Sequence, residues 1–159
     1  VKLISPNYSG RMDHMRAALL RAQLPHIEEK AAQWNARYDL LHRRFSQMKG
    51  ASIPERKQVE AYVGSSIQFR ADGLSREQIP DFIAACNARG AELKWFGDDE
   101  PKAFTSRYDS WKYIDDIPHL PNTHKILANT LDMRIPLTFD EDDCTIIADI
   151  IEDELSNYL

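Results

Sequence analysis

Hydrophobic residues recur at helical spacing from Arg11 to about Met48, and the pattern is interrupted once, at Pro25. Proline has no backbone N–H to donate, so Pro25 suits the first turn of a new helix better than a helix interior. The pattern therefore predicts a helix over about 11–24, a bend, and a second helix over about 25–47.

The first of these predicted helices is apolar on two opposite faces. Successive residues of a helix are about 100° apart, and this rotation sorts the apolar side chains into two groups. The first face collects Met12, Met15, Ala18, Leu19 and Ala22, and the second collects Ala17, Leu20 and Leu24. A surface helix needs only one apolar stripe. Its own domain could cover one face, and a second domain or a second subunit the other, so we expect partners that lie outside the chain.

Strands and a further helix follow. Residues 61–71 alternate in part and carry β-branched and aromatic side chains, which predicts a strand. Ser75 and Gln78 have the spacing of a capping box, so a helix should begin nearby, and Gly90 is well placed to end it. Residues 91–96 follow as a short strand and complete a strand–helix–strand unit.

The last part of the chain begins with a long polar and aromatic stretch, 97–120, which we expect to be a loop. Long loops in compact domains often carry function, and the aromatic side chains here could either line a pocket or pin the loop to the core. Residues 121–132 resemble a helix and 133–137 a short extended piece. The capping-box spacing of Thr138 and Glu141, within an acidic run, predicts a final helix.

The order of these elements predicts an α+β fold. We expect a helical arm over residues 1–48, which links to a large domain and a dimer partner outside the chain, and a small two-layer α/β domain over residues 49–159. A chain of 159 residues, 43% of them hydrophobic, is sufficient for a real core.

Composition narrows the choice of partner and compartment. The net charge of −5, with acidic and basic residues mixed along the chain, argues against a nucleic-acid partner. No apolar run approaches the ~20 residues that span a bilayer, so no membrane partner is expected. Cys86 and Cys144 each lie in an apolar helical pattern, which favours buried free thiols in a reducing compartment and therefore the cytoplasm.

The residues alone do not reveal a self-contained active site. The sequence has no nucleophile elbow, no phosphate-binding loop and no dinucleotide fingerprint. His119 and His124 lie across a predicted helix start, where they are poorly placed to share a metal, so we expect both at the surface. The acidic run at 140–143 is explained by its position at a helix start, so we expect no metal site, and the catalytic residues stay unknown.

The first helix closely resembles a segment of the DegT/StrS family of pyridoxal-phosphate-dependent sugar aminotransferases. The family pattern is Arg-Met, four variable positions, Ala-Ala-aliphatic, three variable positions, then Gln-Leu. The residues that match it in order and spacing are Arg11, Met12, Ala17, Ala18, Leu19, Gln23 and Leu24. Further similar segments follow at 35–41, 65–93 and 120–151. Together with a start at Val1 that reads like the interior of a protein, they place the chain as the C-terminal portion of such an enzyme.

This resemblance implies the C-terminal part of an aspartate-aminotransferase fold-type enzyme that works as a homodimer with active sites at the subunit interface. The full-length enzyme would use pyridoxal 5'-phosphate to transfer an amino group to a keto-sugar nucleotide or a related small carbonyl substrate. Its catalytic lysine would come from the missing N-terminal large domain, because no lysine here matches the family's Schiff-base segment. The fragment alone is therefore expected to be inactive. The alternative is a non-catalytic protein-interaction module that uses the same two-faced helix.

The resemblance also supplies site residues. Ahead of the Arg-Met pair the family carries a Gly-X-Asn-X-Arg stretch, whose asparagine helps to hold the cofactor phosphate of the neighbouring subunit. Arg11 matches the arginine, while Asn7 stands four positions before it and Ser9 occupies the usual asparagine spacing. These three are the candidate cofactor-binding residues, although an ordinary loop fits them equally. Trp95 lies where many members have a His-Tyr pair and is the candidate substrate contact, with a core position as the alternative.

Overall fold

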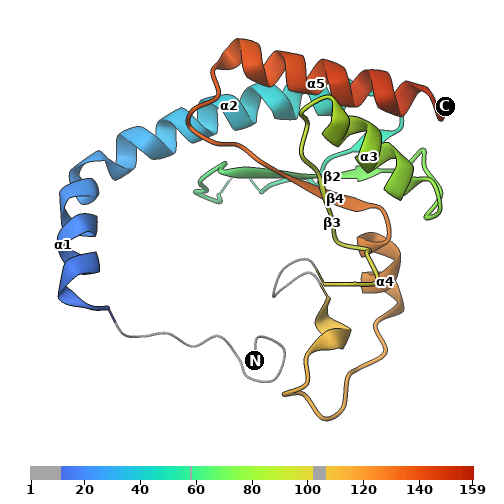
Figure 1. The fold of residues 1–159 in the computed structure, drawn as a ribbon, viewed down its shortest axis with the longest axis horizontal. Helices are drawn as coiled ribbons and strands as arrows, with labels where there is room; N and C mark the ends of the chain where they lie inside the picture. The colour runs from blue at the N-terminus through green and yellow to red at the C-terminus, as the bar shows by residue number, and fades with distance from the viewer. Residues whose placement is uncertain (1–11, 58, 102–106) are drawn as a thin grey trace.

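The computed structural model describes residues 12–57, 59–101 and 107–159. They form an α+β arrangement in which three helices lie on one side of a four-stranded antiparallel sheet (Figure 1). The helices that cover the sheet are α2 (Ile27–Gln47), α3 (Ile79–Ala88) and α5 (Glu141–Ser156). The strands are β1 (Ala51–Ser52), β2 (Ser66–Ala71), β3 (Lys94–Trp95) and β4 (Thr130–Arg134), in the order β1-β2-β4-β3.

The strand register assigns each side chain to one face of the sheet. Ile67 of β2 lies opposite Met133 of β4, and Phe69 lies opposite Leu131. Since side chains alternate along a strand, these four point to the same face. All four are buried, whereas the alternate positions of β2 are only half-buried. The buried face is therefore the one that the helices cover.

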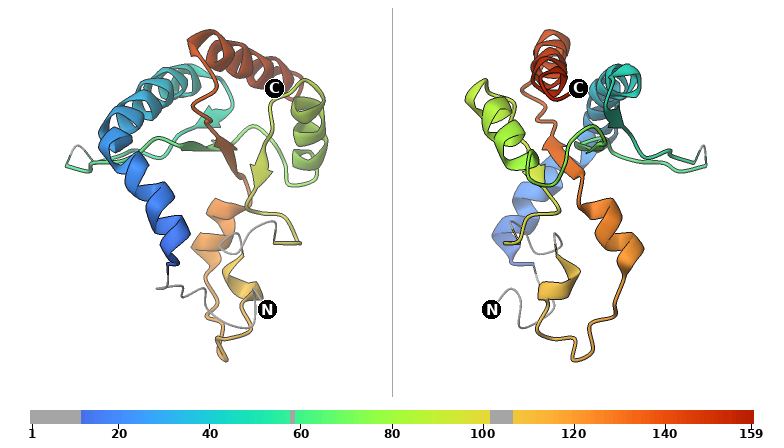
Figure 2. Two further views of the ribbon diagram at one scale, coloured as in Figure 1. Left: turned by 60° about the vertical axis from the view of Figure 1, so that its left-hand side comes forward. Right: turned by 90° about the vertical axis from the view of Figure 1, so that its right-hand side faces the viewer.

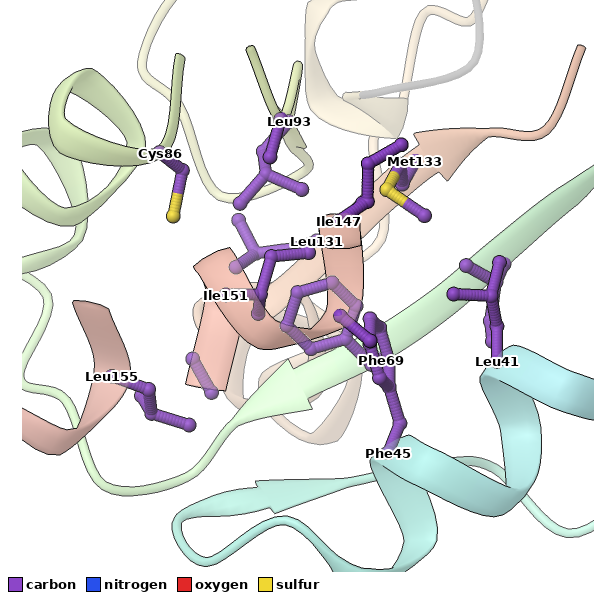
Figure 3. Packing of buried hydrophobic residues seen from close by; sticks show 14 of the residues in the cluster. Leu41, Phe45, Phe69, Cys86, Leu93, Leu131, Met133, Ile147, Ile151 and Leu155 are labelled. Atoms are coloured by element: carbon purple, nitrogen blue, oxygen red, sulfur yellow. The ribbon is translucent and has the colours of Figure 1, made fainter. Parts of the chain in front are cut away.

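The core forms between that face and the helices (Figure 3). The rings of Phe45 in α2 and Phe69 in β2 meet edge to face, with centroids 4.8 Å apart. Around them pack buried side chains from every covering helix: Leu41, Phe82, Cys86, Ile147, Ile151 and Leu155. This arrangement explains the helical spacing of apolar residues in α2 and α5, because each helix buries one stripe.

The predicted helix, bend and helix at the start of the chain are confirmed. The order is α1 (His14–Gln23), a 3₁₀ turn η1 (Leu24–His26) and α2, with Pro25 inside the 3₁₀ turn. Asp13 caps α1 by accepting a hydrogen bond from the backbone N–H of Arg16 at 2.8 Å. Helix α1 lies away from the sheet (Figures 1 and 2).

Helix α1 is not buried by the described residues. No residue of α1 is buried by the described part of the chain, and Met15 and Leu19 on one face are 76% and 64% exposed. Leu20 and Leu24 on the other face are exposed as well. The described residues of its own domain cover neither face, because α1 projects beyond the sheet instead of packing on it. Both apolar faces are open within these residues.

The second half of α2 is docked on the domain. Tyr38, Leu41 and Phe45 are buried, and Trp34 donates from its indole N–H to the carbonyl of Ile135 at 2.9 Å. The guanidinium of Arg37 donates to the carbonyl of Phe139 at 2.5 Å. Helix α2 thus joins the exposed arm to the core, and the division of the chain at residue 48 stays a prediction.

Two predicted elements differ in their bounds. The expected helix over 121–132 ends early, because α4 covers only Pro121–Leu127 and β4 begins at Thr130. Strand β4 is central and pairs with both β2 and β3, so tertiary pairing overrides a local sequence that resembles a helix. The expected strand over 61–71 likewise begins only at Ser66.

The capping interactions at the starts of α3 and α5 agree with the prediction only in part. At α5 the capping box consists of Asp140 and Asp143, not of Thr138 and Glu141 as expected. The Asp140 carboxylate accepts from the N–H of Asp143 at 2.8 Å, and the Asp143 carboxylate accepts from the N–H of Asp140 at 3.0 Å. Before α3, the Gln78 side chain accepts from the backbone N–H of Ser75 at 2.8 Å, as its spacing predicted. After α3, Gly90 has φ +98°, which favours glycine.

Gly64 lies where β2 approaches α2, and it gives a first prediction. A Cβ at this position would collide with Cβ of Tyr38 and lie 2.8 Å from its Cγ, and Tyr38 is a buried residue. Gly64→Ala should therefore lower the free energy of unfolding by about 1–3 kcal/mol, measured by urea denaturation. The control is Ser65→Ala at the exposed neighbouring position, which should change stability by less than about 0.5 kcal/mol. Equal stability of the two variants would contradict the packing described.

Candidate functional site

The residues predicted as site residues divide into two groups. Asn7, Ser9 and Arg11 lie outside the described residues, so their role at a cofactor phosphate stays a prediction. Trp95 is described and is 8% exposed, and its indole N–H donates to the carbonyl of Ala128 at 2.8 Å. The Arg76 guanidinium lies over its ring, 5.0 Å from the centroid. Trp95 is thus packed and paired, and its contact with a substrate also stays a prediction.

A charged cavity of about 150 Å³ lies next to Trp95. It is lined by four segments: the turn before α3, the turn after β3, the 3₁₀ turn η2 (Tyr108–Ser110) and helix α4 (Pro121–Leu127). Its lining residues are Arg76, Phe96, Gly97, Asp98, Asp99, Arg107, Tyr108, Asp109, His124, Leu127 and Ala128. The cavity therefore combines two arginines, three aspartates and a histidine from distant parts of the chain.

Arg107 and Asp109 form the least exposed ion pair at this cavity. Nε of Arg107 donates to Oδ1 of Asp109 at 2.8 Å, and Nη2 donates to Oδ2. This two-point contact with the guanidinium holds the pKa of Asp109 below its usual value, and the same hydrogen bonds raise the pKa of Arg107. Nε2 of His124 lies 3.8 Å from Oδ2 of Asp109. Asp109 is thus an ionised carboxylate that fixes Arg107.

Asp99 joins the two arginines. Its Oδ1 lies 2.7 Å from Nη2 of Arg76 and 3.5 Å from Nη1 of Arg107, while its backbone carbonyl accepts from the same Nη1 at 3.0 Å. Its side chain is 86% exposed. The segment after β3 is therefore tied to η2 and to the turn before α3 by charged contacts.

Gly97 allows this turn to lie so close to the core. A Cβ at Gly97 would lie 2.6 Å from Nε1 of Trp95 and 2.9 Å from the carbonyl oxygen of Ala128. Both atoms belong to the hydrogen bond that fixes the Trp95 ring. A residue without a side chain is therefore required where the wall of the cavity meets Trp95.

The described parts of the chain contain no metal site, no membrane-spanning helix and no activated thiol. They contain no group of three or more His, Cys, Asp or Glu residues that could hold a metal ion. None of their helices is long and apolar enough to cross a membrane. Cys86 and Cys144 are free and buried, as predicted. Burial raises the pKa of the Cys86 thiol to about 12 and also raises the pKa of Cys144, so neither thiol is an activated nucleophile.

The raised thiol pKa values give a second prediction. In the folded chain at pH 8, a thiol reagent should label neither cysteine over minutes, whereas both should react at once in guanidinium chloride. Because the folded pKa of Cys86 lies above its ordinary value of 9.0, its contribution to stability is complete below pH 9 and is lost as the pH rises towards 12. Rapid labelling of the folded chain would show that the helices do not bury these thiols.

Sequence reasoning missed most of this cavity. Arg76, Arg107 and Asp109 belong to no motif, and His124, which is largely exposed as expected, was not linked to them. The available signal was the long polar stretch at 97–120, which supplies two of the four segments that line the cavity. Of its aromatic residues, Tyr108 lies at this wall, with its ring 5.8 Å from that of His124.

Comparison with known proteins identifies the family of this chain. The sequence model of the DegT/DnrJ/EryC1/StrS aminotransferase family matches residues 2–152. The chain belongs to this family. The predicted family is therefore confirmed, and the matched residues include α1, the sheet and all but the last turn of α5. No protein with a curated description matches the chain.

Two solved structures show the same fold. 3-Amino-5-hydroxybenzoic acid synthase superposes with a TM-score of 0.69 at 21% identity, over 89% of this chain and 38% of that one. The aminotransferase TlmJ from Streptoalloteichus hindustanus superposes with a TM-score of 0.73 at 12% identity, over 98% of this chain and 40% of that one. The predicted fold class, α+β and part of an aspartate-aminotransferase fold, is confirmed. This family member spans about two-fifths of the length of the structures it matches.

Proposed function

We propose that this chain is the C-terminal part of a pyridoxal-phosphate-dependent aminotransferase. The full-length enzyme would transfer an amino group to a keto-sugar nucleotide or a related carbonyl substrate. The observation that carries the proposal is the family match over residues 2–152, combined with a span of 38–40% of the related structures. The remaining part would be an N-terminal large domain that supplies the catalytic lysine.

The cofactor, when bound, stabilises negative charge that develops on the amino acid and so makes transfer of the amino group possible. This chain would contribute contacts and not the reacting lysine. Asn7 or Ser9, together with Arg11, would hold the phosphate of the neighbouring subunit's cofactor, and Trp95 would support the wall on the substrate side. Without the large domain the chain should not transaminate.

The partners of this proposal are the large domain and a second copy of the enzyme. Helix α1 supports both, because its two apolar faces are exposed on opposite sides and no described residue covers either. The buried free thiols support a reducing compartment, and we propose the cytoplasm.

The longer protein tests the proposal. Its reading frame upstream of Val1 should encode roughly 200 further residues, a domain-sized length, with a lysine in a segment rich in serine and glycine. The purified protein should take up pyridoxal phosphate with visible absorbance, and borohydride should fix the cofactor covalently to that lysine. A frame that begins just before Val1, or a protein without cofactor uptake, would favour an interaction module instead.

A further inference from the structure

The charged cavity holds two arginines that converge on one carboxylate oxygen. Oδ1 of Asp99 lies 2.7 Å from Arg76 and 3.5 Å from Arg107. Two guanidinium groups this close repel each other unless an anion lies between them. In the free protein Asp99 supplies that anion.

Each arginine also has a second partner that does not depend on Asp99. The Arg76 guanidinium lies over the Trp95 ring, and Trp95 is itself fixed by its hydrogen bond to Ala128. Arg107 is held at two points by Asp109. Both guanidinium groups would therefore keep their positions if Asp99 moved away, which is the condition for a preorganised binding site.

Asp99 itself is weakly held. Its side chain is 86% exposed, and exposed ion pairs contribute little because water and salt screen them. Asp109, by contrast, is 24% exposed and contacts Arg107 at two points. An external anion would therefore displace Asp99 before it displaced Asp109.

The cavity has room for such an exchange. Its volume of about 150 Å³ exceeds that of several water molecules at ~30 Å³ each. Asp98 and Asp109 remain in its lining, and Asp109 stays paired with Arg107. An external oxyanion that takes the place of Asp99 therefore leaves the number of carboxylate or phosphate groups in contact with the two arginines unchanged.

We propose that Arg76 and Arg107 form a binding site for the carboxylate or phosphate group of a small molecule, and that Asp99 occupies this site in the free protein. Arg76 suits this role because a guanidinium can bind either oxyanion at two points, and Nη1 of Arg107, which does not contact Asp109, supplies a further donor. This site is separate from the proposed aminotransferase function. Anion binding to it requires no cofactor and can be measured on the 159-residue chain.

Calorimetric titration of this chain with malonate and with inorganic phosphate, at constant ionic strength, tests the proposal. Asp99→Asn removes the internal competitor and should tighten binding by about three- to tenfold, and Arg76→Gln should weaken it by about tenfold. Arg107 is left unchanged, since its loss would also release Asp109. The matched control is Asp153→Asn, because Asp153 is 67% exposed and pairs with Arg89 at 3.1 Å. This control should bind like the unmodified chain.

The two ligands separate the two sources of the oxyanion. Saturable binding of malonate alone assigns a carboxylate, and saturable binding of phosphate alone assigns a phosphoryl group. Binding of either that responds to Asp99→Asn and Arg76→Gln as expected supports the site. No saturable binding to Asp99→Asn, or equal affinities in all variants, would overturn it. Because no step uses the cofactor, failure here leaves the aminotransferase proposal unaffected.

Discussion

Replacing Phe69 with alanine should lower the free energy of unfolding by about 3–5 kcal/mol. Phe69 is fully buried at the centre of the sheet, and its ring meets that of Phe45 edge to face at 4.8 Å. The substitution removes this contact and leaves a cavity between β2 and the helices that neighbouring side chains fill only in part. Urea denaturation of the 159-residue chain measures the loss.

The matched control for Phe69→Ala is Ile146→Ala on the exposed side of α5. Ile146 is 57% exposed, so its truncation should change stability by less than about 0.5 kcal/mol. If Phe69→Ala cost as little as Ile146→Ala, β2 would not form the centre of the core.

The second large effect is expected at α1 in the longer enzyme. Two paired substitutions address its faces separately: Met15→Glu with Leu19→Glu, and Leu20→Glu with Leu24→Glu. Burial of one such side chain contributes about 1.5–3 kcal/mol, so each pair should cost several kcal/mol at the surface it meets. We expect one pair to convert dimers to monomers in light scattering, and the other to lower the unfolding temperature by loosening the large domain.

Ile126→Glu on α4 is the control for the α1 variants, since Ile126 is an exposed apolar residue of a helix outside the arm. It should leave both the mass and the unfolding temperature unchanged. If either α1 pair behaved like Ile126→Glu, that face would have no partner.

Much of the fold follows from local sequence. Pro25 predicts the bend between α1 and α2 because proline lacks a backbone donor, and the structure has it there. The alternation through Ile67 and Phe69 identifies β2 because one face of a sheet is buried. These signals succeed because each depends on a residue's own backbone or on a periodic face.

The element that was predicted wrongly, β4, depends on contacts between distant segments of the chain. Thr130–Asp132 reads as the end of a helix, but β2 and β3 pair with it from both sides. Asp132 becomes half of a buried polar contact, since its carboxylate accepts from the Gln68 side chain at 2.5 Å. No local pattern in residues 121–132 predicts pairing with β2 or β3.

The candidate site was less predictable than the fold. Arg76 precedes α3, whereas Arg107 and Asp109 lie beyond β3, so only the folded chain brings them to one cavity. A single arginine in a polar loop cannot be distinguished from a solvated charge by sequence. The helix with two apolar faces was visible in the sequence, but which surfaces cover it depends on polypeptide outside the described residues.

The most direct test of the account is the rate of amide hydrogen exchange in α1. The described residues bury no part of α1, so its amides should exchange within seconds to minutes in the 159-residue chain. In the longer enzyme the account predicts protection of the same amides by at least about a hundredfold, because the large domain and the second subunit cover both faces. Equally rapid exchange of the α1 amides in the longer enzyme would contradict it.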